Sequence, residues 1–313
     1  MSAPSSVDNK ARAALLVLTA IGLATTQDAI VKSMSGTYPV YETMVIRGFT
    51  SLPILAIWLW WRHGIHRLIT PHWPRIVLRG VILCSAYLAF VLSIAAMPMA
   101  NAVAIYFTMP FFVGALAGPF LGERVPLDRW IAIVTGFIGV IVMVRPGVEA
   151  FEPASLLALY SVFGYAVGQM MGRRLAQKVE PLVIANWQNA IYFLVAIAMG
   201  AFLMTADLPA TSHKSLAFLM HPFAWPTLEH FIGLSAVGLL AAFAMMSFIS
   251  AYKLEESNFV APFEYSGMVW AVGFGFIIFN DFPDARTWIG MAIVAGAGLF
   301  MLAMDGWAKR QSP

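Results

Sequence analysis

The feature that most constrains this chain is a series of long apolar stretches separated by short polar connections. Each stretch runs for roughly 18–25 residues, which is the length that a helix needs to cross ~30 Å of hydrocarbon. A transmembrane β-barrel would instead show alternating segments of about ten residues. Of the 313 residues, 60% are hydrophobic and 11% are charged, whereas soluble domains carry about 25% charged residues. The sequence therefore predicts an all-α, multi-pass membrane protein.

Ten transmembrane helices are predicted from these stretches. We expect them at residues 12–33, 41–61, 76–96, 99–121, 129–145, 154–174, 182–205, 228–252, 258–279 and 286–307. The connections between them are short with one exception, residues 206–227, which we expect to form a partly amphipathic lid on one membrane face. The first apolar stretch continues through Asp28 and Lys32, so we interpret it as an uncleaved helix and not as a signal peptide.

The distribution of Lys and Arg predicts the orientation. If the N-terminus is cytoplasmic, fourteen basic residues, Arg79 among them, fall on the cytoplasmic side. Only Lys32, Arg145, Lys214 and Arg286 fall on the opposite side. Cytoplasmic connections of membrane proteins are enriched in these residues. The sequence therefore predicts an inner (plasma) membrane protein of bacterial type with both termini in the cytoplasm, and hence an even number of helices.

A weak internal repeat divides the chain. The pattern around Asn101 recurs around Asn258, 157 positions later, and Pro126 has its counterpart in Pro283 at the same offset. This predicts two five-helix halves, residues 1–147 and 148–313, in one transmembrane unit. Because five is odd, the halves would insert with opposite orientation. Such inverted repeats are typical of secondary transporters, whose substrate site lies near the midplane between the halves.

Residues 99–147 also resemble a known family. A small-residue helix ends in Leu121-Gly122-Glu123, a short hinge leads to Trp130, and Gly136 and Gly139 precede Arg145-Pro146-Gly147. This pattern is similar to the ten-helix, EamA-type branch of the drug/metabolite transporter superfamily. In the second half Phe279-Asn280 replaces the Gly-Glu pair, so Glu123 has no counterpart there.

The resemblance implies two inverted five-helix repeats around a central cavity. It places helices 1, 3, 4, 6, 8 and 9 around that cavity and helices 5 and 10 outside, and it implies transport of small metabolites. Within the family, the chain looks most like bacterial amino-acid exporters of the YddG type.

Charged residues inside apolar stretches are the first candidates for a substrate site, because a charge in hydrocarbon is costly. Glu264, two turns into helix 9, could bind a substrate amino group or carry a proton. It could also be a structural carboxylate paired with Arg47. Asp28 lies four residues before Lys32, a spacing that favours an ion pair within one helix. Alternatively, Asp28 faces the cavity.

The remaining cavity candidates are polar or aromatic residues on the predicted cavity helices. Tyrosines offer an apolar face and a hydroxyl together, which suits amphipathic solutes. Asn101 and Asn258 begin matching helices, where they could cap backbone donors instead of contacting a substrate. The predicted cavity set is Glu264, Tyr265, Tyr87, Tyr106, Tyr160, Tyr165, Trp270, Asn101, Asn258 and Asp28.

Proline and glycine predict where the helices bend and pack. Pro98, Pro110, Pro262 and Gly267 occupy or bracket helices 4 and 9, and we expect them to act as hinges because proline removes a backbone hydrogen bond. Gly164, Gly168 and Gly172 form a four-residue ladder that favours close helix contact.

These observations predict a secondary transporter that exports small metabolites, with amino acids, including aromatic and hydrophobic ones, as the first choice. Uptake of a larger nucleoside or adenine-containing metabolite is the alternative. An intramembrane enzyme is disfavoured, because no nucleophile–base pair or metal cluster lies within the helices. A passive structural protein would not explain Glu264. We expect a small-molecule substrate and the bilayer as partners, and no nucleic acid, cofactor or metal.

Overall fold

The computed structural model describes residues 6–109, 111–113, 115–116, 127–145, 152–206, 212–254, 260 and 263–311. Over these residues the chain is helical and contains no strand. In order, the elements are α1 (Ser6–Met34), α2 (Val40–His63), the 3₁₀ helix η1 (Ile65–Leu68), α3 (Trp73–Ala96), α4 (Met99–Tyr106), α6 (Leu127–Val144), α7 (Ala154–Ala176), α8 (Pro181–Thr205), α9 (Lys214–Met220), α10 (Leu228–Leu254), α12 (Ser266–Phe279) and α13 (Ala285–Gln311).

Among the described residues, six helices are long and apolar enough to cross a membrane: α1, α2, α3, α7, α8 and α10. Four shorter apolar helices, within Met99–Val113, Trp130–Val144, Ser266–Phe279 and Ala285–Met301, fall in the other four predicted ranges. The all-helical, multi-pass prediction is therefore confirmed, while the count of ten full spans stays a prediction.

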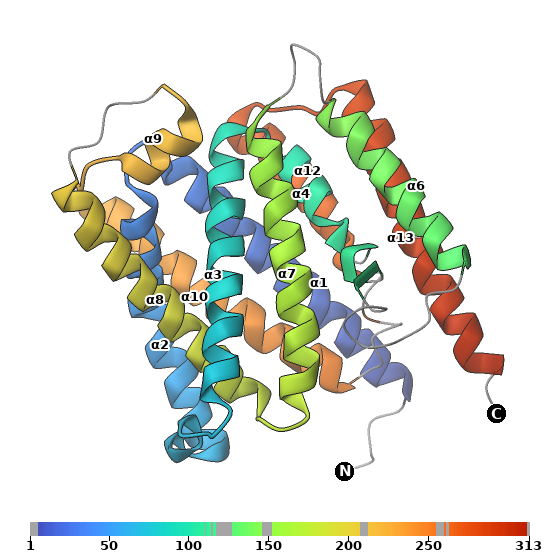
Figure 1. The fold of residues 1–313 in the computed structure, drawn as a ribbon, viewed down its shortest axis with the longest axis horizontal. Coiled ribbons are helices and arrows are strands. Elements are labelled where there is room, and N and C mark those ends of the chain that lie inside the picture. Colours follow the sequence, from blue (N-terminus) through green and yellow to red (C-terminus); the bar gives the residue numbers. More distant parts are fainter. Residues whose placement is uncertain are drawn as a thin grey trace.

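The bundle is built from helices that pack against one another in pairs. In Figure 1, α3 and α7 run side by side in the centre, and α2, α8 and α10 form one flank. The closest packing joins α1 to α10, α3 to α7, α2 to both α8 and α10, and α3 to α8. The glycine ladder of α7 faces α3: a Cβ on Gly164 or Gly168 would lie 2.8 Å from the Cβ of Ala86 or 2.4 Å from Leu83 Cδ2. The predicted close approach at this ladder is confirmed.

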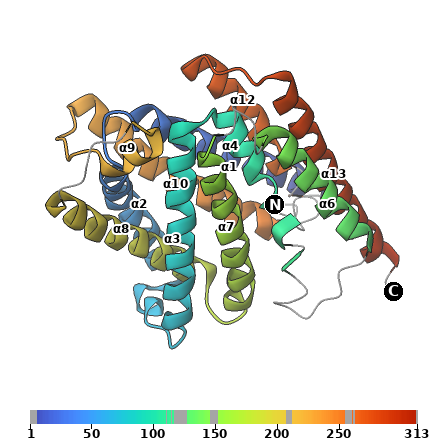
Figure 2. The ribbon, with the colours of Figure 1, turned by 45° about the horizontal axis from the view of Figure 1, so that its top comes forward.

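The helices α6 and α13 form a separate pair at the edge of the bundle (Figures 1 and 2). Their backbones meet at two glycines. A Cβ on Gly290 would lie 2.7 Å from the carbonyl oxygen of Gly139, and one on Gly139 would lie 3.0 Å from that of Gly290. At this crossing neither helix has room for a side chain.

Three details differ from the sequence-based expectations. The helix expected at 99–121 is interrupted, because α4 ends at Tyr106 and Phe107–Thr108 form a turn. The expected lid contains the short helix α9. Arg79, assigned above to a cytoplasmic connection, is 9% exposed within the bundle.

Arg79 joins three helices from its place in α3. Its Nε donates a 2.9 Å hydrogen bond to the Gly168 carbonyl of α7, and Nη1 donates one of 2.9 Å to Gln188 Oε1 of α8. Hydropathy alone could not show that Arg79 is buried, because a single arginine near a helix end usually reaches the membrane surface.

Candidate functional site: a central cavity

A cavity of about 740 Å³ lies between the helices. This volume is within the range of small-molecule sites, about 300–1,000 Å³. Its described lining comes from α1, α2, α3, α4, α7, α8, α10, α12 and the segment that leads into α12. The family resemblance implied six cavity helices, numbers 1, 3, 4, 6, 8 and 9 of the ten predicted. The helices α2 and α8, which fall in the predicted ranges 41–61 and 182–205, also line the cavity, and the resemblance did not include them. None of the described residues of α6 or α13 lines the cavity, so this pair lies outside it.

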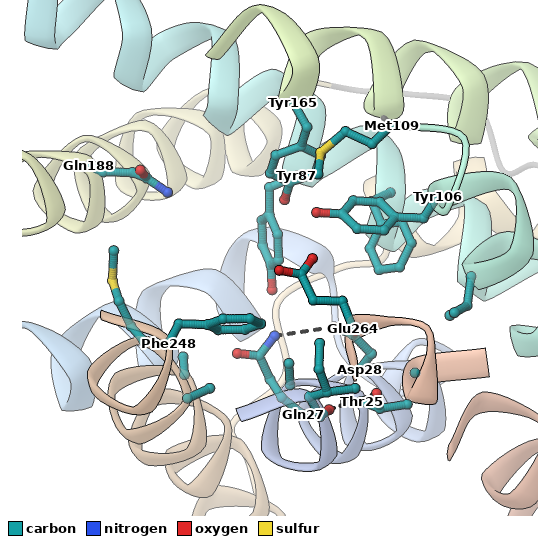
Figure 3. Close-up of a pocket in the computed structure, with 18 of the residues that line it drawn as sticks. Thr25, Gln27, Asp28, Tyr87, Tyr106, Met109, Tyr165, Gln188, Phe248 and Glu264 are labelled. Carbon is teal, nitrogen blue, oxygen red and sulfur yellow. Dashed lines mark hydrogen bonds between the residues drawn. The ribbon is translucent and has the colours of Figure 1, made fainter. Parts of the chain in front are cut away.

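Two carboxylates line the cavity, Asp28 of α1 and Glu264 just before α12. Asp28 Oδ1 accepts a 3.2 Å hydrogen bond from Gln27 Nε2 (Figure 3). In the same view Glu264 extends toward Tyr87 and Tyr106. The two acidic side chains therefore line the same cavity from neighbouring elements.

Three of the predicted tyrosines, Tyr87, Tyr106 and Tyr165, come together on the opposite wall (Figure 3). The rings of Tyr106 and Tyr165 pack edge to face, with centroids 5.5 Å apart. The ring centroid of Phe90 lies 5.7 Å from that of Tyr106. The Tyr87 hydroxyl is buried and has no hydrogen-bond partner among the described residues. The wall therefore presents aromatic faces and one hydroxyl that the described part of the chain leaves unbonded.

Arg47 of α2 is the one Lys or Arg side chain among the described lining residues. Its guanidinium carbon lies 4.6 Å from the ring centroid of Tyr87 and 5.7 Å from that of Tyr192, as in a cation–π contact. Its Nε is buried, and no described residue forms a hydrogen bond with it. The described lining of the cavity thus carries one basic side chain, Arg47, and two carboxylates, Asp28 and Glu264.

The α8 wall is polar because of Gln188 and Asn189. Gln188 accepts from Arg79, and Asn189 Nδ2 donates a 3.0 Å hydrogen bond to the Ala185 carbonyl. Tyr192, one turn further, donates a 2.8 Å hydrogen bond to the Leu83 carbonyl. These bonds hold the polar wall in place and bind α8 to α3.

Four predicted site residues lie away from the cavity lining. Tyr160 is 50% exposed and bonds to Ser85 Oγ at 2.9 Å. Trp270 is half exposed and stacks on Phe274. Tyr265 stacks on Phe107, and its hydroxyl abuts Gly298 of α13. Asn101 is the third residue of α4, whose N-cap is Pro98, so it is not the N-cap residue.

The hinge candidates and the second-half asparagine are placed as follows. Gly267 lines the cavity and packs on Phe107, and Pro98 begins α4. Asn258, Pro110 and Pro262 lie outside the described residues.

Several lining residues were not predicted as site residues. Phe107, Phe248 and Gln169 project into the cavity. Phe107 and Phe248 could not be distinguished in the sequence from lipid-facing or core phenylalanines, because helical spacing alone does not say which neighbour a face meets. Gln169 did carry a signal, since an uncharged amide inside an apolar helix needs a partner.

The C-terminal end of α1 is held by Lys32. Its Nζ donates a 2.6 Å hydrogen bond to the Met97 carbonyl and lies 3.6 Å from Asp281 Oδ2. The ion pair favoured from the Asp28–Lys32 spacing is therefore wrong: Lys32 reaches across to the α12–α13 connection and leaves Asp28 on the cavity wall.

Arg145, at the end of α6, pairs with Asp284 in the same connection. The Arg145 guanidinium and Thr287 hydrogen bonds lower the pKa of Asp284 to about 2. Two ion pairs thus link the first half of the chain to the connection between α12 and α13.

Comparison with known proteins places this architecture in a family. The model of the EamA-like transporter family matches twice, over residues 11–145 and 153–304. The chain is 27% identical to a riboflavin transporter of Brucella anthropi over 85% of this chain and 87% of that one. It is 25% identical to an S-adenosylmethionine uptake transporter of Rickettsia bellii, over 72% and 71% of the two chains. It is 26% identical to a pseudopaline exporter of Pseudomonas aeruginosa, over 90% and 93%.

A solved crystal structure also shares this fold. It superposes with a TM-score of 0.62 and covers 96% of this chain and 99% of its own, at 19% identity. The likeness over nearly the full length agrees with the double family match. The chain therefore belongs to the EamA-like transporter family, and it is a multi-pass membrane transporter of a small molecule.

Proposed function

We propose that this protein is a secondary transporter that carries an amine-bearing, partly aromatic metabolite through the central cavity by alternating access. The observation that carries the proposal is the arrangement of Asp28 and Glu264 opposite Tyr87 and Tyr106. A substrate ammonium group would pair with the carboxylates. Its apolar part would lie against the aromatic rings.

Arg47 extends this recognition to a zwitterion. An unpartnered Nε beside two tyrosine rings offers a place for a substrate carboxylate. Charge-assisted hydrogen bonds at both ends of a solute would orient it. An amino acid satisfies both ends, so we propose amino acids, aromatic and hydrophobic ones first, with export as the direction.

The contacts between helices support two inverted repeats, residues 1–147 and 148–313. The first-half helices α1, α3 and α4 would correspond to α7, α10 and α12. On that correspondence α1–α10 packing matches α7–α3 packing, and α1–α12 matches α7–α4. The double family match, at 11–145 and 153–304, agrees with this division. Rocking of such halves about a midplane site is the usual mechanism.

An inner-membrane location with both termini in the cytoplasm is the orientation that we propose. In Figure 1, α1 begins and α13 ends at the lower end of the bundle. The cavity lining reaches Pro181, the first residue of α8, toward that same end, whereas the ion pair of Lys32 with Asp281 lies at the opposite end of α1. We therefore interpret this conformation as inward-facing.

A larger substrate is a second candidate from the same class. Relatives are named for S-adenosylmethionine uptake and riboflavin transport, and a cavity of about 740 Å³ exceeds what one amino acid fills. An adenine-containing metabolite with a free amino group would use the same carboxylates and rings. We do not propose an enzyme, because the relatives are transporters.

Counterflow in proteoliposomes tests the proposal. Vesicles loaded with unlabelled tryptophan should accumulate labelled tryptophan, and Glu264→Gln should lower the rate about tenfold, the loss expected for one charged hydrogen bond. Glu229→Gln makes the same substitution at an exposed position at the start of α10 and should leave the rate unchanged.

Competition by substrate analogues tests recognition of the amine and of the carboxylate separately. Tryptamine lacks the carboxylate and indole-3-propionate lacks the amine, so both should compete less well than tryptophan. If no amino acid exchanges above empty liposomes while S-adenosylmethionine does, the second candidate replaces the first. Unchanged exchange in Glu264→Gln at every pH would remove Glu264 from the site.

A further inference from the structure

A second cavity, of about 570 Å³, lies between α2, α8 and the segment that leads into α10. Its described lining shares no residue with that of the central cavity. Tyr41, Glu42 and Val45 line it on one face of α2, and Ala196, Gly200 and Ala201 on one face of α8. The small side chains of α8 leave a groove along that helix.

Glu42 is the one charged residue among the described lining residues. Its side chain is almost fully buried, at 4% exposure, and Oε1 has no hydrogen-bond partner in the described part of the chain. Oε2 accepts one long hydrogen bond, of 3.5 Å, from the Ala224 backbone N–H. A buried carboxylate is costly unless a cation reaches it. No Lys or Arg among the described lining residues supplies one.

The groove begins at the ends of two membrane-spanning helices, α2 and α8. Glu42 is the third residue of α2, and Met204 of the lining is the penultimate residue of α8. At this rim Trp225 is 87% exposed, and Phe223 packs edge to face on it. Exposed aromatic residues at helix ends mark the membrane–water interface. From Met204 to Ala196 the groove descends about 12 Å toward the hydrocarbon, at 1.5 Å per residue.

We propose that this groove binds one phosphatidylethanolamine molecule from the bilayer. Its ammonium group would donate hydrogen bonds to Glu42, and one acyl chain would lie against Val45, Ala196 and Gly200. Charge complementarity selects this lipid. A choline headgroup has the charge but no N–H donor, and a glycerol headgroup has no cation.

A headgroup methylation series tests the proposal on the full chain in detergent. Native mass spectrometry should give the tightest binding for phosphatidylethanolamine and weaker binding with each added N-methyl group. The difference from phosphatidylcholine should reach about tenfold. Glu42→Gln should remove this preference. Glu229→Gln, an equal change of charge at an exposed position, should retain it.

A second variant keeps the test decisive if Glu42→Gln does not fold. Ala201 is an exposed lining residue, so Ala201→Phe should fill the groove and weaken every headgroup alike. Equal binding of phosphatidylethanolamine and phosphatidylcholine by the unsubstituted protein would overturn the proposal. So would a preference that persists in Glu42→Gln. Neither result depends on what the central cavity transports.

Discussion

At the scale of single residues, Asp284 uses its two carboxylate oxygens for different purposes. Oδ1 accepts a 2.9 Å hydrogen bond from the Thr287 backbone N–H, which caps the start of α13, and Oδ2 pairs with Arg145 of α6. Asparagine can cap a helix but cannot form the ion pair. The two roles can therefore be separated by substitution.

We expect Asp284→Asn to lower the free energy of unfolding by up to about 1 kcal/mol, because the pair is half exposed and screened by solvent. Asp284→Ala should cost roughly 0.5–2 kcal/mol more through loss of the cap. The pKa of Asp284 is lowered to about 2. Its charge therefore stabilises the fold above about pH 4, and this contribution disappears as the pH falls toward 2.

Thermal unfolding in detergent over a pH series measures both effects. Asp284→Asn should flatten the loss of stability between about pH 4 and pH 2 relative to the unsubstituted protein. A variant curve parallel to that of the unsubstituted protein across this range would contradict the assignment of the low pKa to this pair.

Residue pairing was the part of the site that the sequence predicted least well. The rule that residues four apart on a helix are neighbours applies within one helix only, so it paired Lys32 with Asp28. In the folded chain Lys32 meets Asp281, almost 250 residues away. By the same limitation Tyr265, adjacent to Glu264 in sequence, faces α13, and Trp270, six residues after Glu264, is half exposed at the bundle exterior. Asp28, Glu264 and three tyrosines were identifiable because polar groups in apolar stretches are conspicuous.

At the scale of elements, hydropathy predicted most of the helices. Apolar length locates a spanning helix within a few residues, and α2, α3 and α8 begin or end within three residues of the expected positions. Hydropathy did not locate the break at Phe107, because the apolar run continues past Tyr106. The hinge expected from Pro110 was the one sequence signal in this stretch, since proline has no N–H to donate to the carbonyl four residues earlier. Which helices line the cavity depends on packing, which is why α2 and α8 were missed.

The contact between α6 and α13 gives a prediction at this scale. A Cβ on Gly290 would lie 2.7 Å from a backbone oxygen of Gly139, so Gly290→Ala must push the helices apart. We expect a loss of about 1–3 kcal/mol, as for other overpacked interiors. Gly296→Ala on the same helix meets nothing within 4 Å and should be neutral or slightly stabilising. Unfolding in detergent measures both, and equal stability of the two variants would contradict the close contact.

At the scale of the whole molecule, the proposed alternating access requires the end of the cavity near Lys32 to open. Lys32 joins α1 to the connection between α12 and α13, and it also bonds to the end of α3. In the inward-facing interpretation these contacts must break once in every cycle. A covalent link at this position would hold that end closed while leaving the cavity intact.

Cross-linking at this position tests alternating access most directly. Lys32→Cys and Asp281→Cys are introduced together with Cys84→Ala, which removes the single native cysteine. The two thiols are then joined by a short, reducible bifunctional reagent in proteoliposomes, with each single-cysteine protein treated alike. We predict that substrate exchange stops in the cross-linked double variant, returns on reduction, and continues in the single variants. Exchange that proceeds at an unchanged rate through the cross-linked protein would contradict alternating access at this cavity.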